Sequence, residues 1–449
     1  MTPYTHSSTM IKASSTFRYA LTFFIACSLC AQASASAPST TSAKTPPGTE
    51  QQSLGTTTNP KINAVLDKID QNLLLGYLTT LVNYGPRTDG TYGCELSAQY
   101  IHAQFQEQGL NTRYQNWTSW GNRYHPHKYS CQNIEGTLPG TDSSDDSIII
   151  FNAHYDSVKA APGANDDGSG TAAVLAAAYA LSQFHFNRTL KFVTFAGEEL
   201  GLLGSQAYTK EAYEHNDNIL LEINADMIGH DNGSRTMRVI STEDAGWVAD
   251  ILQTMASNYS IGLTINPGST NRVGHKMTGS DYSPFLEYGW ESVSCWETTG
   301  DPNMHTAQDD LSNINLSYLV NTTKAIAGAL AYLADLPETP PQVRIASPRV
   351  GSRYIAGMQK HDLKNFKTTV IDDIWIWAEV HYGTAPIMKA EFYDNGKLVS
   401  TITQAPFKWH LNERSLGKHE IMVKVYDQLG RTSTDWRELR FINLFLKNR

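Results

Sequence analysis

Cysteine, clustered positive charge and long apolar runs are all scarce in this sequence of 449 residues. The formal net charge is -9 and no dense tract of lysine and arginine occurs, which argues against binding to the phosphate backbone of nucleic acids. The apolar run at 19–31 falls about a third short of the ~20 residues that a membrane-spanning helix needs. We therefore expect neither a nucleic-acid partner nor stable insertion into a membrane.

The N-terminal segment has the order of a secretory signal peptide. Lys12 and Arg18 precede the apolar run, and Ala-Ser-Ala-Ser-Ala follows it as a cleavage site. Residues 1–37 are therefore predicted to be a signal peptide, and the mature protein is expected in the periplasm or the medium. Retention by the uncleaved segment and lipid attachment at Cys27 are the alternatives. Residues 38–60, rich in Ser, Thr, Pro and Gly, are expected to be a flexible spacer.

The few cysteines outside the leader are informative. Cys94, Cys131 and Cys295 remain, an odd number in an oxidising compartment, which predicts one disulfide and one free thiol. We expect Cys94 to pair with Cys131, because these two flank one unit formed by a helical stretch at 95–108 and the segment that returns from it. Cys295 lies in a strand-like run and is expected to be a buried thiol.

Apolar runs alternate with helical patterns from residue 61 onward. Strand-like runs lie at 147–153, 190–196, 219–225, 237–241 and 293–296, and helical patterns lie at 170–184 and 317–336. Buried strands that alternate with helices predict an α/β domain at 61–336 with a mostly parallel sheet covered by helices on both faces.

A second composition shift marks a domain boundary. Residues 337–341 read Pro-Glu-Thr-Pro-Pro, a rigid linker directly after a helical pattern. Beyond it, short alternating segments separated by turn signals predict a small all-β sandwich at 342–449. Its string EFYDNGKLVSTITQAPFKWHLN resembles the immunoglobulin-like modules appended to many secreted bacterial enzymes. This region carries no catalytic constellation, and its partner is left open.

Polar motifs begin where predicted strands end, which is where open α/β sheets bind ligands. The candidate ligands in these motifs are two histidines and three carboxylates, namely His154, Asp166, Glu199, Asp226 and His305. Zinc accepts imidazole and carboxylate, but this set is too large for one tetrahedral ion. It suggests two metals that share a carboxylate and a hydroxide. In the pair Glu198-Glu199, one carboxylate can bind metal while its neighbour takes a proton from the bound water.

The motifs also resemble those of a known family. FNAHYDSV, PGANDDGSGTAAVLA, FAGEELGLLGS, NADMIGHD, GSDYSPF and MHTAQDD are similar, in order and spacing, to the motifs of the bacterial leucyl-type two-zinc aminopeptidases, which are co-catalytic zinc exopeptidases. The resemblance covers roughly 61–336 and implies the zinc exopeptidase fold with two zinc ions. It implies that Asp166 bridges the ions, with His154 and Asp226 on one zinc and Glu199 and His305 on the other.

The same resemblance assigns Glu198 as general base and Asp156 as the carboxylate that orients the His154 ring. The implied activity is that of a secreted zinc-dependent aminopeptidase acting on a peptide or protein with a free N-terminus. A glutaminyl cyclase or a carboxypeptidase of the same fold is an alternative enzyme. A non-catalytic extracellular binding protein is the alternative from another class, and the intact base and ligands argue against it.

The sequence departs from the family pattern in one loop. Tyr282 stands where relatives often have histidine, and methionine stands where relatives often supply a tyrosine for the scissile carbonyl. The oxyanion donor is therefore open, and Tyr282 is our candidate because it is a phenol in the same loop. Asp281 either supports the ligands from behind or caps the loop. Asp309 either caps the following helix or supports His305.

Overall fold

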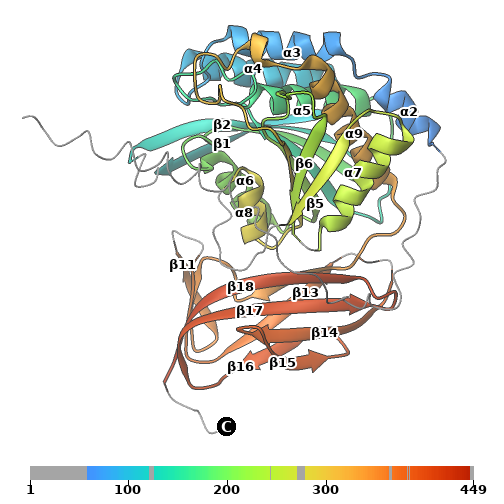
Figure 1. Ribbon diagram of the computed structural model, residues 1–449. Helices are drawn as coiled ribbons and strands as arrows, with labels where there is room; N and C mark the ends of the chain where they lie inside the picture. The colour runs from blue at the N-terminus through green and yellow to red at the C-terminus, as the bar shows by residue number, and fades with distance from the viewer. Residues whose placement is uncertain are drawn as a thin grey trace, which may run out of the picture. The chain divides into compact units, whose positions relative to one another are not determined.

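The computed structural model describes residues 58–120, 126–242, 244–269, 279–363, 367–381, 383 and 385–444 (Figure 1). The signal peptide and nearly all of the spacer lie outside these residues, so both stay predictions. Among the described helices, none has the length and the apolar character that crossing a bilayer requires.

The first part of the described chain is an eight-stranded sheet with helices packed on it. The strand order is β1-β2-β4-β3-β5-β8-β6-β7. The strands are β1 (Asn111–Trp120), β2 (Lys128–Leu138), β3 (Ile148–His154), β4 (Thr189–Phe195), β5 (Ile219–Ala225), β6 (Thr236–Ser241), β7 (Thr264–Ser269) and β8 (Ser292–Glu297). The helices are α2 (Pro60–Leu66), α3 (Gln71–Asn83), α4 (Tyr92–Glu107), α5 (Gly168–Leu181), α6 (Leu203–His215), α7 (Gly246–Asn258), α8 (Tyr282–Glu287), the 3-10 turn η1 (Leu311–Asn313) and α9 (Leu316–Asp335).

The centre of this sheet is parallel and its flanks are mixed. β3 pairs in parallel with β4 and β5, and β5 pairs in parallel with β8. The pairs β1–β2, β2–β4 and β6–β8 are antiparallel. The predicted α/β fold with a mostly parallel sheet is confirmed, and the antiparallel pairs lie toward the flanks of the sheet. β1 was missed by the sequence pattern because exposed and half-buried residues dominate it, whereas buried parallel strands read as continuous apolar runs.

Helices cover both faces of the sheet, as predicted (Figure 1). Side chains alternate along β3, since successive residues of a strand point to opposite faces. Ile149 and Phe151 belong to the larger core, which also contains the apolar side chains of α3, α5 and α9. Ile150 belongs to a second core with Tyr208 of α6 and Phe285 of α8. The central strands are therefore buried on both faces of the sheet.

Helix α5 begins directly against the end of β5. It is rich in alanine and almost entirely buried, and its N-cap residue Asp167 accepts a hydrogen bond from the backbone N–H of Gly170. A Cβ atom at Gly170 would lie 2.3 Å from the carbonyl oxygen of Ala225. Only glycine permits this approach, which brings the loop before α5 to the carboxyl ends of the strands.

The C-terminal part is all-β, as predicted, and has a core of its own. Its two sheets have the orders β11-β10-β12-β18-β17-β14-β15 and β16-β13-β9. The strands are β9 (Gln342–Ser347), β10 (Ser352–Ile355), β11 (Met358–Asp362), β12 (Thr368–Ile371), β13 (Ile374–His381), β14 (Ile387–Asp394), β15 (Lys397–Ile402), β16 (Lys408–Leu411), β17 (Ser415–Asp427) and β18 (Thr432–Asn443). Side chains such as Ile376, Phe392, Val423 and Phe441 fill the core. β9 begins immediately after the proline-rich segment.

Candidate metal centre

Three central strands deliver polar residues to one edge of the sheet. His154 is the last residue of β3, and Asp226 directly follows β5. Glu198 and Glu199 follow β4 after two residues, and His154 is in register with Phe195 of that strand. Because these strands are parallel, their carboxyl ends meet, and residues separated by dozens of positions in the sequence become neighbours.

The five predicted ligands come together as two groups of three. In the first, His154 Nε2 lies 3.3 Å from Asp166 Oδ1 and 3.7 Å from Asp226 Oδ1. In the second, His305 Nε2 lies 3.1 Å from Asp166 Oδ2 and 3.2 Å from Glu199 Oε2. Within each group, one ligand atom from every residue lies within 4.8 Å of the others. Asp166 belongs to both groups and presents a different oxygen to each histidine.

The two histidines differ in exposure. The side chain of His154 is 1% exposed, whereas that of His305 is 45% exposed. The centre is therefore closed on the side of β3 and open to solvent on the side of the loop that carries His305.

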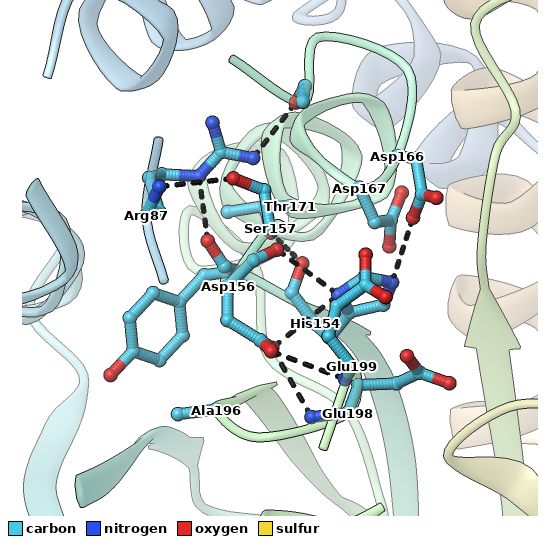
Figure 2. Close-up of polar contacts among 12 residues, drawn as sticks. Arg87, His154, Asp156, Ser157, Asp166, Asp167, Thr171, Ala196, Glu198 and Glu199 are labelled. Atoms are coloured by element: carbon cyan, nitrogen blue, oxygen red, sulfur yellow. Dashed lines mark hydrogen bonds and ion pairs between the residues drawn. The ribbon is translucent and has the colours of Figure 1, made fainter. Parts of the chain in front are cut away.

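Asp156 ties the His154 ring to the turn after β4 (Figure 2). Its Oδ1 lies 3.4 Å from His154 Nδ1, the ring nitrogen that faces away from Asp166. The same carboxylate accepts the backbone N–H groups of Glu198 and Glu199, each at 3.3 Å. The backbone carbonyl oxygen of Asp156 lies 3.2 Å from the same ring nitrogen. One buried residue thus orients the imidazole through its carbonyl and its carboxylate, and positions both glutamates.

Asp309 holds the loop that carries Asp166, a role different from both of those predicted. Its Oδ1 accepts the backbone N–H of Asn165 at 2.7 Å, and its Oδ2 accepts that of Asp166 at 3.1 Å. The 3-10 turn after it is capped by Asp310 instead. The fully buried Asp309 therefore holds the loop that carries His305 against the loop before α5.

Arg87 is a positioning residue that the sequence pattern did not identify. It is completely buried, and its guanidinium donates to the backbone carbonyls of Tyr155, Pro162 and Gly163. It fastens the segment after His154 to the loop that leads to Asp166. An arginine whose partners are carbonyl oxygens 68 to 76 residues away leaves no motif in the sequence.

The centre concentrates acidic groups. Burial raises the pKa of Glu198, and the nearby charges of Asp281, Asp226 and Glu199 raise it further, against the lowering effect of His154. Burial likewise raises the pKa of Asp226. Hydrogen bonds to Asp166 and Glu199 raise the pKa of His305 to about 10. In the metal-free protein, protonated imidazole is thus the counter-charge to these carboxylates.

The donor set fits divalent metal ions. Imidazole nitrogen and carboxylate oxygen are ligands that zinc prefers, and three protein ligands per ion leave a position for water. Glu199 Oε1 is buried and has no hydrogen-bond partner among the described residues. A buried carboxylate oxygen without a partner is costly, and a cation would remove that cost.

The remaining predicted site residues lie as follows. Asp281 is fully buried at the start of α8 and makes no capping hydrogen bond there, and burial raises its pKa to about 7. Tyr282 is buried with its hydroxyl against Gly279, since a Cβ atom there would lie 2.6 Å from it. The oxyanion role of Tyr282 thus stays a prediction without a supporting contact.

The predicted disulfide is not formed in this structure. Cys94 and Cys131 are neighbours, but both are free thiols whose sulfur atoms are 3.6 Å apart, longer than the ~2.05 Å of a disulfide. The prediction that these two residues lie next to each other is therefore confirmed, whereas the disulfide bond between them is not formed. Cys295 is a buried free thiol, as predicted.

Comparison with known proteins agrees with this geometry. Residues 133–330 match the profile of Peptidase family M28. The chain is 30% identical over 211 residues to "Aminopeptidase YwaD" of Bacillus subtilis (strain 168), covering 44% of each protein. It spans between 44% and 62% of the length of the first curated relatives.

Solved structures show the same fold. The LapA aminopeptidase of Legionella pneumophila superposes with a TM-score of 0.54 at 23% identity, covering 63% of this chain and 76% of that one. BSAP, a zinc aminopeptidase from Bacillus subtilis, gives a TM-score of 0.52 at 18% identity, covering 60% of this chain and 97% of that one. At these identities the likeness concerns the fold.

Proposed function

We propose that this protein is a secreted zinc-dependent aminopeptidase, because residues 133–330 match Peptidase family M28. The observation that carries the proposal is the pair of ligand groups that share Asp166. One ion would be held by His154, Asp166 and Asp226, and the other by Asp166, Glu199 and His305. Bound zinc supplies polarisation of the scissile carbonyl and a lowered pKa for the attacking water.

Glu198 acts as the general base. Its carboxylate belongs to neither ligand group and forms no hydrogen bond with another described residue, although its backbone is fixed by Asp156. It is therefore free to take a proton from the attacking water and to return it to the leaving amine. Asp156 contributes by holding His154 and this turn in one arrangement.

The substrate is a peptide with a free N-terminus. This assignment is supported by the names of the relatives rather than by a substrate pocket. Export is supported by the order of the N-terminal segment, basic residues, apolar run and small residues. The exposed side of the centre at His305 is compatible with a polypeptide approaching from solvent.

The test is hydrolysis of a panel of aminoacyl p-nitroanilides by the purified protein, with zinc content measured by mass spectrometry. We expect release of p-nitroaniline that is abolished by a chelator and restored by zinc. Substrates with an acetylated N-terminus should not react, and the Glu198→Gln variant excludes a contaminating peptidase. Loss of ammonia from an N-terminal glutaminyl peptide, without release of an amino acid, would overturn the proposal in favour of a cyclase.

A further inference from the structure

A second cluster of metal-ligand types lies outside the centre described above. Asp89 precedes α4, Cys94 lies in the first turn of that helix, and Cys131 lies in β2. Cys94 Sγ is 3.6 Å from Cys131 Sγ and 3.8 Å from Asp89 Oδ1. One ligand atom from each of the three residues lies within 4.8 Å of the others. None of them belongs to the two-metal centre.

We propose that Asp89, Cys94 and Cys131 form an additional site for a thiophilic divalent cation, with zinc as the ion it suits. The two cysteines would bind as thiolates and Asp89 through one carboxylate oxygen, leaving water in the fourth tetrahedral position. Binding would release to solvent the protons held by the thiols and by the Asp89 carboxyl. The inference does not depend on the proposed aminopeptidase activity.

The spacing of the sulfur atoms supports a metal more than a disulfide. Two thiolates on a tetrahedral zinc ion, with zinc–sulfur bonds of ~2.3 Å, lie about 3.8 Å from each other. The observed 3.6 Å between Cys94 and Cys131 is close to that edge. A disulfide would require the two sulfur atoms to approach to ~2.05 Å.

Asp89 supplies the second argument. Its Oδ2 is buried and has no hydrogen-bond partner among the described residues. A disulfide would supply no positive charge to this carboxylate, whereas a divalent cation would balance two of the three negative charges of Asp89 and the two thiolates. Burial and the charge of Asp156 raise the pKa of Asp89 to about 10, as expected for a carboxylate that lacks a positive partner.

The cluster lies behind the turn that carries the general base. A Cβ atom at Gly197, the residue before Glu198, would lie 3.0 Å from Asp89 Oδ2. On the other side, the hydroxyl of Tyr155 lies 3.6 Å from Cys131 Sγ, and Tyr155 directly follows His154. An ion in this site would therefore join α4 to β2 and support two residues of the neighbouring centre from behind. Cys131 is only half-buried, which gives the ion a path from solvent.

Cobalt substitution tests the site directly. The full-length mature protein is purified under reducing conditions, stripped with a chelator and titrated with Co²⁺. We expect a thiolate-to-cobalt charge-transfer band in the near ultraviolet, because the two-metal centre offers only nitrogen and oxygen ligands. Cys131→Ser should abolish the band and lower the zinc content by one ion per chain. The matched control Cys295→Ala, which removes the remaining buried thiol, should keep both.

Protection of the thiols provides a readout without any variant, in case Cys131→Ser does not fold. Zinc should protect Cys94 and Cys131 of the wild-type protein from a thiol reagent, and a chelator should restore their reactivity. Absence of the charge-transfer band with reduced thiols would overturn the proposal. So would an intact mass showing that the pair is a disulfide in protein purified without reductant and loaded with zinc. A thiolate band in a protein that hydrolyses no aminoacyl substrate would instead count against the proposed function alone.

Discussion

The carboxylate of Asp309 accepts a hydrogen bond from the backbone nitrogen of Asp166 at 3.1 Å, across 143 residues of sequence. Asp166 is the residue shared by both ligand groups. The loop that carries His305 therefore also fixes the backbone of Asp166, the candidate bridging ligand. Both ligand groups therefore depend on this contact for the position of the residue that they share.

Replacing Asp309 by asparagine should weaken metal binding although Asp309 touches no ligand side chain. The amide keeps one acceptor oxygen, so one of the two backbone N–H groups at Asn165 and Asp166 loses its partner. Loss of such supporting contacts typically costs ~10- to 100-fold in metal affinity. Competition with a chelator measures the zinc dissociation constant. The control is Asp310→Asn, a neighbouring half-buried carboxylate that caps η1 and should leave zinc affinity unchanged. Equal zinc affinities in the two variants would contradict the proposed role of Asp309 in positioning Asp166.

The adjacent glutamates should give opposite phenotypes. Glu198→Gln removes the base but leaves both ligand groups intact, so zinc content should stay at the wild-type level. Turnover should fall by ~10²- to 10⁴-fold, the usual contribution of general base catalysis. Glu199→Gln should instead lose metal from the group that contains His305. Zinc analysis of both purified variants separates the roles, and a Glu198→Gln enzyme with more than about a tenth of wild-type turnover would show that another group is the base.

Zinc affinity should rise with pH. Hydrogen bonds to Asp166 and Glu199 raise the pKa of His305 to about 10 in the metal-free protein, so its imidazole is protonated at neutral pH. Metal binds the neutral ring, and the proton must leave first. Lowering the pH therefore weakens binding, and raising it toward that pKa strengthens binding. Zinc titrations between about pH 6 and 8 measure the trend, together with proton release in weakly buffered solution. An affinity that does not change over this range would contradict the protonated state of the ring.

The strands that form the edge of the sheet were predictable because local chemistry marks them. β5 has the predicted bounds, since it is an apolar run that ends directly before the polar Asp226. α6 was not predicted because its start lacks a capping side chain: Leu202 stands at the N-cap and makes no side-chain hydrogen bond. α7 begins without a side-chain cap as well.

The candidate ligands were also predictable from local sequence, whereas the residues that hold them in place were not. Each ligand lies in a motif next to a strand end or in a loop that carries several polar residues. The roles of Arg87 and Asp309 depend on backbone groups far away in the sequence, so only the folded chain reveals them. Asp89 escaped notice because a single carboxylate before a helix resembles an ordinary capping residue. Its proximity to two thiols arises from the packing of α4 on β2.

The last prediction distinguishes the bridging ligand from the residue behind it by comparing Asp166→Asn with Asp156→Asn. The two changes are chemically identical and both residues are buried. Asp166 is the one residue common to the two ligand groups, so its variant should lose metal from both positions and nearly all activity with it. Asp156 contacts the His154 ring and the backbone N–H groups of Glu198 and Glu199, and it binds no metal itself.

Asp156→Asn should therefore lose only ~10- to 100-fold in metal affinity or activity, the usual cost of a lost supporting contact. Added zinc should restore part of its activity, because all five ligands remain. The same addition should hardly restore Asp166→Asn, in which each ion lacks a carboxylate oxygen. Zinc stoichiometry and activity are measured on both purified variants as zinc is increased. Equal stoichiometry and equal recovery would show that Asp166 does not bridge the two ions.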